Sequence, residues 1–358
     1  RLLLTSGGPN DSLTGSAAAL TRGLVRYDAA GQRDAAFCAR LDQIEPAVTQ
    51  LVPLADSSVL VAGAFTALNG VPTRGLARLH PITDAYATRL TNLSLRALSG
   101  PGEQTLIAGF IVAGSSGTRS VLLRGVGPGL VPLGLDAAAV HPDPRLTLYR
   151  RSADIAANDE WDSTLASTAA ALGAFPLTLG RHDSALLATL APEQYTAHVP
   201  GPVAGPRLAL LEVYDASLAP DDINSARLAN ISGRAEVLGG DGIIVAGFVV
   251  SGPHPLRVLV RGIGPALAPF GVINVLADPQ LRLFRASSEG AQLITTNDDW
   301  AGDPALKAAF ATVGAGELPD DSKDAALLAT LNPGVYTAQL SGANSATGVG
   351  LIEIYEVR

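Results

Sequence analysis

Two acidic turns are the segments whose residue types best fit ligand binding. Each combines Asn and Asp around a tryptophan, Trp161 or Trp300, and is followed by one more Asp before an Ala-Leu-Leu segment. The residues are Asn158, Asp159, Asp162 and Asp183 in the first turn, and Asn297, Asp298, Asp299, Asp303 and Asp324 in the second. Calcium takes about 6–8 oxygen ligands, which clustered Asp and Asn on loops supply. The sequence therefore suggests a calcium site present twice. The simpler interpretation, which we favour, is that these residues form turns through hydrogen bonds to their own backbone.

Two glycine-containing segments, Arg-Gly-Val-Gly-Pro at 124–128 and Arg-Gly-Ile-Gly-Pro at 261–265, are the next candidates. They lack the third glycine of a dinucleotide-binding loop, and the chain has no Gly-Lys-Ser/Thr. Gly and Pro at this spacing predict a tight turn. We expect the arginine at each strand end to pair with a recurring carboxylate, Glu212 or Glu353, as a buried ion pair that helps to specify the fold.

Catalytic groups are not duplicated. His80 lies outside the repeated region, and none of the other histidines, His141, His182, His198 and His254, has a histidine at the equivalent place of the other copy. No metal-binding spacing and no Gly-x-Ser-x-Gly segment is present, and the single cysteine, Cys38, is interpreted as a small core residue. The sequence therefore predicts that the chain is not an enzyme.

The elements that must position these residues are written twice. Ile-Ala-Gly-Phe-Ile-Val at 107–112 returns as Val-Ala-Gly-Phe-Val-Val at 245–250, and Leu-Glu-Val-Tyr at 211–214 returns as Ile-Glu-Ile-Tyr at 352–355. We expect two complete domains, residues 85–215 and 227–358, joined by a polar linker, 216–226.

Each copy is predicted to be almost entirely β-strand. The apolar runs 105–112 and 243–250 fit central strands buried on both faces, and the strands 120–124 and 257–261 are expected to pair with them as hairpins. Short helices are expected only at 164–172 and 304–312. Asn92 and Asn230 match the glycosylation pattern, but their position on a strand predicts a hydrogen-bonding role.

Residues 1–84 contain a weaker repeat. Val-Leu-Val-Ala-Gly-Ala-Phe at 59–65 and Thr-Arg-Gly-Leu-Ala-Arg-Leu at 73–79 match segments near 2–8 and 21–27. Apolar strands separated by glycine loops at this period predict a short propeller-like β-repeat segment. This part resembles the delta-60 repeat family of bacterial surface proteins.

The second half of each copy is similar to the bacterial pre-peptidase C-terminal domain. The likeness rests on the Leu-Thr-Leu-Tyr and Leu-Arg-Leu-Phe strands, the Asn-Asp turns, and the Tyr-Thr-Ala strands at 195–197 and 336–338. It implies a small jelly-roll-like β-sandwich that in some relatives binds calcium near such a turn. The whole module also resembles a repeat common at the C-termini of large secreted proteins of Verrucomicrobia-like bacteria. Neither likeness implies an activity.

Composition narrows the classes of function. The chain has 358 residues, 47% hydrophobic and 16% charged, which is the composition of a globular protein. A net charge of −8 argues against nucleic acid or an anionic membrane as the main partner. The longest apolar run, 243–250, is far shorter than the roughly 20 residues of a membrane helix. Because the chain contains no methionine, we expect it to be a processed product or a fragment.

We therefore expect an all-β protein: two tandem jelly-roll-like β-sandwich modules behind a short β-repeat segment. The expected function is a non-enzymatic, secreted or cell-surface structural or adhesive module, the C-terminal part of a larger protein. Its expected partners are a protein or glycan at the cell surface, or other copies of itself, and calcium is its only candidate cofactor. Two alternatives stay open: a subunit of an extracellular fibre or sheath assembled through β edges, and a carbohydrate-binding appendage of an enzyme.

Overall fold

The structure, a computed structural model, describes residues 88–115, 117–217 and 226–358, and residues 23–24, 39–40, 48–54, 59–68, 71–73 and 75–79 nearer the N-terminus. The chain divides into two compact units, Arg1–Tyr86 and Ala87–Arg358. Most of the predicted linker, including 218–225, lies outside the described residues, as do the repeat segments near 2–8 and most of 21–27.

The N-terminal unit contains a small antiparallel sheet. Its strands are β3 (Gln50–Pro53), β4 (Val59–Ala62) and β7 (Leu76–Leu79), and two short pairs accompany it, β1 (Gly23–Leu24) with β2 (Ala39–Arg40) and β5 (Ala67–Leu68) with β6 (Val71–Pro72). Among the residues of this unit that the structure describes, the buried apolar ones are Val59, Val61 and Phe65, which belong to the predicted apolar strand and the glycine loop that follows it.

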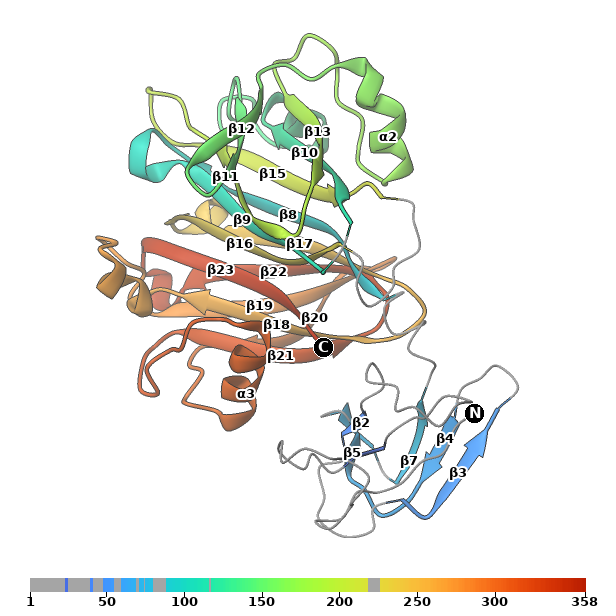
Figure 1. Ribbon diagram of the computed structural model, residues 1–358. Coiled ribbons are helices and arrows are strands. Elements are labelled where there is room, and N and C mark those ends of the chain that lie inside the picture. Colours follow the sequence, from blue (N-terminus) through green and yellow to red (C-terminus); the bar gives the residue numbers. More distant parts are fainter. Residues whose placement is uncertain are drawn as a thin grey trace. The chain divides into compact units, whose positions relative to one another are not determined.

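The second unit is a two-layer sandwich of eight-stranded antiparallel sheets (Figure 1). The first sheet contains, in spatial order, β13 (Ser184–Leu190), β10 (Arg119–Val126), β15 (Arg207–Asp215), β8 (Arg89–Ser99), β17 (Ile244–Ser251), β22 (Gly334–Gly342), β19 (Pro279–Ser287) and β20 (Gly290–Asn297). The second contains β12 (Ala153–Asn158), β11 (Leu146–Arg150), β14 (Glu193–Val199), β9 (Leu106–Ala113), β16 (Arg227–Val237), β23 (Gly348–Val357), β18 (Leu256–Ile263) and β21 (Ala325–Leu331).

Helices are short and lie between strands. The α-helices are α2 (Ala166–Ala171) and α3 (Pro304–Val313), as the alanine-rich segments predict, and the 3-10 helices are η1 (Gly102–Gln104), η2 (Pro128–Leu133), η3 (Ser163–Leu165), η4 (Gly240–Gly242), η5 (Pro265–Phe270) and η6 (Ala343–Ser345). None of the helices in the described part of the chain has the length and apolar character needed to span a membrane.

Each copy is a jelly roll, because its strands pass repeatedly from one sheet to the other. The predicted hairpins between 105–112 and 120–124, and between 243–250 and 257–261, are therefore wrong: β9 and β10 lie in different sheets, as do β17 and β18. The connecting loop of residues 114–118 is long enough to cross the roughly 10 Å between packed sheets. True hairpins join β11 to β12 and β19 to β20.

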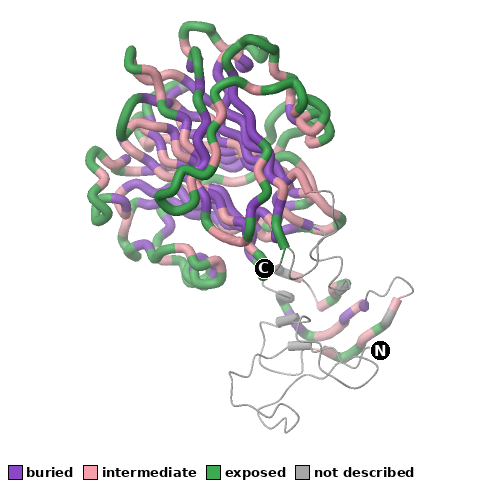
Figure 2. The backbone as a smooth tube through the Cα atoms, turned by 45° about the horizontal axis from the view of Figure 1, so that its top comes forward, coloured by how far each residue is buried: buried purple, intermediate pink, exposed green. Residues whose placement is uncertain are grey.

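Burial also differs from the prediction for the apolar runs. Along β9 and β17, fully buried residues alternate with half-buried ones, so only one face is fully covered. By contrast, β10 and β18 are buried on both faces. Val121 and Leu123 of β10 join the core between the sheets, whereas Leu122 packs outward against the segment around α2. Buried residues follow the strands and exposed residues follow the loops (Figure 2).

The two copies share both sheets. In the first sheet β8 of copy one pairs with β17 of copy two, and in the second sheet β9 of copy one pairs with β16 of copy two, both antiparallel. The first two strands of each copy thus form the contact, and the first strand of one copy pairs with the second strand of the other. We call this contact the internal junction. It encloses one continuous hydrophobic core that contains Phe110 and Phe248, which stack on Tyr195 and Tyr336.

The repeated Ala-Gly-Phe and Asn-x-Ser segments meet at the internal junction. Gly109 of β9 lies opposite Ser232 of β16, and Gly247 of β17 lies opposite Ser94 of β8. A Cβ on Gly109 would be 2.5 Å from Ser232 Oγ, and the same distance separates a Cβ on Gly247 from Ser94 Oγ. The glycine of one copy is therefore matched to the serine of the other.

We expect Gly109→Ala to lower the free energy of unfolding by about 1–3 kcal/mol, because the new methyl group collides with Ser232 Oγ. Ser232→Ala in the same chain should restore most of the loss, since the neighbouring Cβ is 3.9 Å away. Urea unfolding of the two single variants and the double variant measures this coupling. Additive effects of the two substitutions would contradict the pairing.

Candidate functional site

A buried ion pair recurs on the outer face of each copy. Arg124 lies on β10 directly opposite Glu212 of β15, with 3.1 Å between Nε and Oε2. In copy two the Nε atom of Arg261 lies 3.2 Å from Oε2 of Glu353. The side chains of both arginines are at most 3% exposed. The predicted ion pairs are confirmed.

A tyrosine and an asparagine extend each ion pair. The Tyr214 hydroxyl donates to Glu212 Oε1 over 2.7 Å and also shares a hydrogen bond with the Asn92 side chain. Tyr355, Glu353 and Asn230 repeat the arrangement in copy two. The two asparagines thus lie on strands and form hydrogen bonds, as predicted. We call these two sets the outer networks.

Burial determines the charge balance of the outer networks. Desolvation raises the pKa of the Glu212 carboxyl, while Arg124 and the Tyr214 hydroxyl oppose that shift by stabilising the charged form. Desolvation also raises the pKa of Tyr214, and the adjacent Glu212 charge raises it further. The phenol therefore stays protonated and acts as a hydrogen-bond donor, not as a base.

An aromatic ring covers each arginine, but from a different sequence position. The Arg124 guanidinium lies 4.4 Å from the centre of the Phe175 ring, and that of Arg261 lies 4.6 Å from the Phe310 ring. Aligning the copies on Asp183 and Asp324 places Phe175 opposite Gly316 and Phe310 opposite Ala169. The small and aromatic residues are exchanged between the two positions, so each copy has one ring over its arginine.

The hydrogen bond from each arginine to the loop backbone comes from equivalent positions in the two copies, although the aromatic ring does not. Arg124 Nη1 donates to the carbonyl of Phe175 over 2.9 Å, and Arg261 Nη1 donates to the carbonyl of Gly316 over 2.7 Å. These two carbonyls belong to equivalent residues. The loop path is thus retained between the copies, while the residue that supplies the ring has changed.

Asp183 and Asp324 hold the glycine turns that follow the two arginines. Asp183 Oδ1 accepts hydrogen bonds from the backbone N–H groups of Gly127 and Gly129 at 2.8 and 3.1 Å. Asp324 Oδ1 accepts from Gly264 N–H at 2.7 Å in copy two. Desolvation raises the pKa of Asp183, and its two backbone hydrogen bonds oppose the shift. The glycine segments are thus turns clamped by an aspartate, in agreement with the predicted tight turn.

Four more residues of the acidic turns also bond to backbone. Asn158 Oδ1 accepts from the second residue of β13 at 2.9 Å, and Asn297 Oδ1 does the same for β21 at 2.8 Å. Asp162 caps η3 through an N–H at 2.7 Å, and Asp303 caps α3 through N–H groups at 2.6 and 3.1 Å. These contacts satisfy the free N–H groups at the start of a helix or strand.

The remaining acids of the turns lie at the surface. Asp299 pairs with Lys323 at 2.8 Å, and at the equivalent place in copy one Glu160 lies 2.8 Å from His182. Burial and the neighbouring Asp278 and Asp299 raise the pKa of Asp298, whereas Asp159 is an exposed turn residue. Among the residues that the structure describes, no group of three or more His, Cys, Asp or Glu side chains is placed to hold a metal. The calcium site stays a prediction.

No protein-family model matches the chain, and no curated protein does. Two solved virus structures are similar to this chain at a low level. One, described as the atomic structure of Sulfolobus turreted icosahedral virus, is 10% identical, covers 99% of this chain and 89% of its own, and has a TM-score of 0.17. The other, described by a triple jelly roll fold and turret assembly, is 11% identical, covers 89% and 81%, and has a TM-score of 0.16. Scores this low carry no argument about function.

The described histidines lie in separate elements. His141 follows η2 and hydrogen-bonds the Pro200 carbonyl at 2.9 Å, and its burial lowers its pKa. His198 lies on β14, where its ring contacts Tyr149, and His254 lies between β17 and β18. His80 and Cys38 fall outside the described residues.

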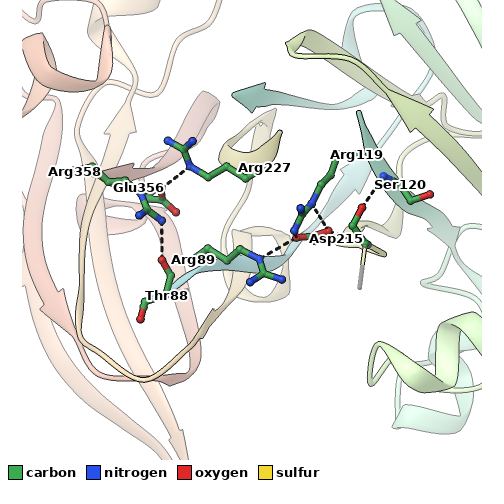
Figure 3. A network of polar contacts seen from close by, with 9 residues as sticks. Thr88, Arg89, Arg119, Ser120, Asp215, Arg227, Glu356 and Arg358 are labelled. Carbon is green, nitrogen blue, oxygen red and sulfur yellow. Dashed lines mark hydrogen bonds and ion pairs between the residues drawn. The ribbon is translucent and has the colours of Figure 1, made fainter. Parts of the chain in front are cut away.

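Sequence reasoning missed a second pair of networks, where each copy's first and last strands meet (Figure 3). In copy one, the Asp215 carboxylate of β15 accepts hydrogen bonds from Arg89 Nε at 3.1 Å and from Arg119 Nε at 2.6 Å. In copy two, the Glu356 carboxylate of β23 accepts a hydrogen bond from Arg227 Nε at 3.1 Å and also pairs with Arg358. In each copy, therefore, one buried carboxylate on the last strand binds two arginines, one of which lies on the first strand.

The sequence signal for these networks is the acidic residue that directly follows the tyrosine of each copy's last strand, Tyr214 or Tyr355. Asp215 and Glu356 occupy this place, and Arg89 and Arg227 begin the repeated first strands. Arg358 also donates to the Thr88 carbonyl at 2.7 Å, which ties the last residue to the first described residue of the sandwich. Chemically, both kinds of network neutralise and fix charged groups.

We expect Phe175→Gly to lower the free energy of unfolding by about 1–2 kcal/mol, because the Arg124 guanidinium loses its ring. The double variant Ala169→Phe/Phe175→Gly, which copies the arrangement of copy two, should regain stability. Thermal unfolding of both variants tests the exchange. If the double variant is no more stable than Phe175→Gly, the two positions do not substitute for each other.

Asp183→Ala should lower the free energy of unfolding by about 1–3 kcal/mol for each buried N–H group that it leaves without an acceptor. Urea unfolding measures this loss.

Asp183→Asn keeps the hydrogen-bond acceptor and removes the charge. Because the pKa of Asp183 is raised in the fold, the wild-type contribution falls as pH rises through that pKa. The melting temperature of Asp183→Asn relative to wild type should therefore increase from about pH 4 to about pH 7. A constant difference would contradict the raised pKa.

We expect equal melting temperatures in millimolar calcium and in EDTA, because six of the nine residues of the acidic turns already use a side-chain oxygen to accept a backbone hydrogen bond. A calcium site filled at a hundredfold excess over its Kd would instead add about 2.7 kcal/mol. A rise in calcium that disappears in Asp298→Asn/Asp299→Asn would establish the site in copy two.

Proposed function

We propose that the chain is a non-enzymatic structural or adhesive β module that is secreted or displayed at a cell surface. One observation carries the proposal. The polar residues that recur in both copies, Arg124 with Glu212 and Asp183 foremost, are bonded to partners within the fold. The histidines, which catalysis would more readily use, differ between the copies.

An adhesive role is supported by exposed apolar residues that recur. Leu133 at the end of η2 is 57% exposed, and its equivalent at the end of η5, Phe270, is 84% exposed. Each is followed by a glycine in the left-handed conformation, Gly134 or Gly271, which fixes the end of the helical turn. A large apolar side chain kept in solvent at equivalent places of both copies fits contact with a protein or glycan partner.

The test combines binding and activity on the full chain. Fluorescently labelled protein is incubated with washed bacterial envelopes and with a glycan array, and the same preparation is assayed against peptide, ester and glycoside substrates. We expect saturable binding without turnover, and weaker binding by Leu133→Ser/Phe270→Ser. Val203→Ser, at a 94% exposed residue outside these turns, is the matched control and should bind like wild type.

Turnover that disappears when one recurring pair is substituted, such as Glu212→Gln/Glu353→Gln with the fold retained, would overturn the proposal. Equal loss of binding in the Val203→Ser control would remove the role assigned to the two exposed residues.

A further inference from the structure

The sandwich has two ends, and each end presents two edge strands. At the copy-one end the first sheet finishes with β13 and the second with β12, and at the copy-two end they finish with β20 and β21. A strand at the edge of a sheet has unpaired N–H and C=O groups that accept another strand. Natural proteins usually protect such strands with charge, proline or a bulge.

Charge and proline are nearly absent from these edges. Within the four strands, all of which the structure describes, Asp154 is the only charged residue, and none contains proline. Large apolar side chains are exposed there instead, namely Ile155 at 40%, Leu187 at 46%, Leu293 at 46% and Ile294 at 42%. Ile155 of β12 and Ile294 of β20 are equivalent residues of the two copies.

Bulges are present, but they do not prevent pairing in this fold. The hairpins β11–β12 and β19–β20 each contain a register shift. The two strand pairs of the internal junction also contain register shifts, between Leu228 and Asn230 and between Val249 and Val250, and both pairs form.

Strand direction makes the two ends complementary. All neighbouring strands are antiparallel and each sheet has eight strands, so the first and last strands of a sheet run in opposite directions. A second molecule placed in the same orientation therefore brings its β13 antiparallel to β20, and its β12 antiparallel to β21. Both sheets continue at once.

This contact repeats the geometry of the internal junction. There, the first strand of each copy pairs with the second strand of the other. Between molecules, the fifth strand of each copy would pair with the sixth strand of the other. The chain already contains one working example of sheet continuation between two copies of its module.

We propose that a second copy of this chain docks head to tail on these ends, β20 and β21 of one molecule pairing with β13 and β12 of the next. The contact is heterologous, so repetition yields a filament when the rotation between successive molecules does not close into a ring. The inference deepens the proposed function by naming the chain itself as the partner, and it rests on the structural role proposed above.

The test uses matched lysine substitutions in the full chain. Ile155→Lys blocks the copy-one end and Ile294→Lys blocks the equivalent position at the copy-two end. Val335→Lys is the control, because Val335 is 51% exposed but lies on the interior strand β22. Mass is measured by analytical ultracentrifugation over a concentration series, filaments are sought by electron microscopy, and circular dichroism with thermal unfolding confirms each fold.

Wild type and Val335→Lys should grow in mass with concentration, whereas each blocked variant alone should remain a monomer. An equimolar mixture of the two blocked variants should stop at two chains, because only one compatible pair of ends remains. Folded wild type that stays monomeric at its solubility limit would overturn the proposal. Dimers of Ile155→Lys alone would also overturn it, since they require end-to-end pairing of identical edges. Neither result bears on envelope binding or turnover, so failure of self-association is distinguishable from failure of the proposed function.

Discussion

The reciprocal pairing of the two copies is the constraint on which the rest of the sandwich depends. β8 with β17 and β9 with β16 convert two four-plus-four jelly rolls into two continuous sheets over one core. This arrangement removes two pairs of edges that separate modules would expose. It also explains why Gly109 and Gly247 carry no side chain, since Ser232 and Ser94 of the other copy occupy that space. The segments that identify the duplication most clearly in the sequence are the segments through which the copies meet.

Buried polar side chains line the outer side of two strands in this sandwich. On the outer side of β10 and β18, an ion pair, a phenol and a ring replace the purely apolar layer found between the sheets. A buried ion pair contributes little net stability, because desolvation offsets the attraction, but its bonding geometry restricts how a loop can pack. The loop path around Phe175 and Gly316 is accordingly retained through the same arginine–carbonyl bond. Each copy keeps an aromatic ring over the arginine guanidinium, although the ring comes from a different sequence position in each copy.

Much of this could be predicted from the sequence. Duplication located both copies, the alanine-rich segments located α2 and α3, and the recurrence of Arg124 and Glu212 in both copies predicted their ion pair. The hairpin between β9 and β10 was predicted wrongly, because a five-residue loop fits both a turn within a sheet and a crossing between sheets. Burial of β9 was overestimated for a related reason: its apolar run does not show which strand the loops will cover. The networks at Asp215 and Glu356 were missed because they join residues far apart in sequence, and the exchange of Phe175 for Phe310 is visible only once both arginines are placed in space.

The comparison of the two copies also bears on what the module is for. Two copies in one chain experience the same solvent and the same fold, so a feature retained in both serves either the fold or a surface that the fold presents. The outer networks, the aspartate-clamped turns and the strand caps serve the fold, and their atoms are engaged there. Among the large apolar residues that are exposed in the described chain, two pairs recur at equivalent places: the turn residues Leu133 and Phe270, and the edge residues Ile155 and Ile294. Both pairs are apolar, exposed and uncharged, which suits contact with other macromolecules better than catalysis.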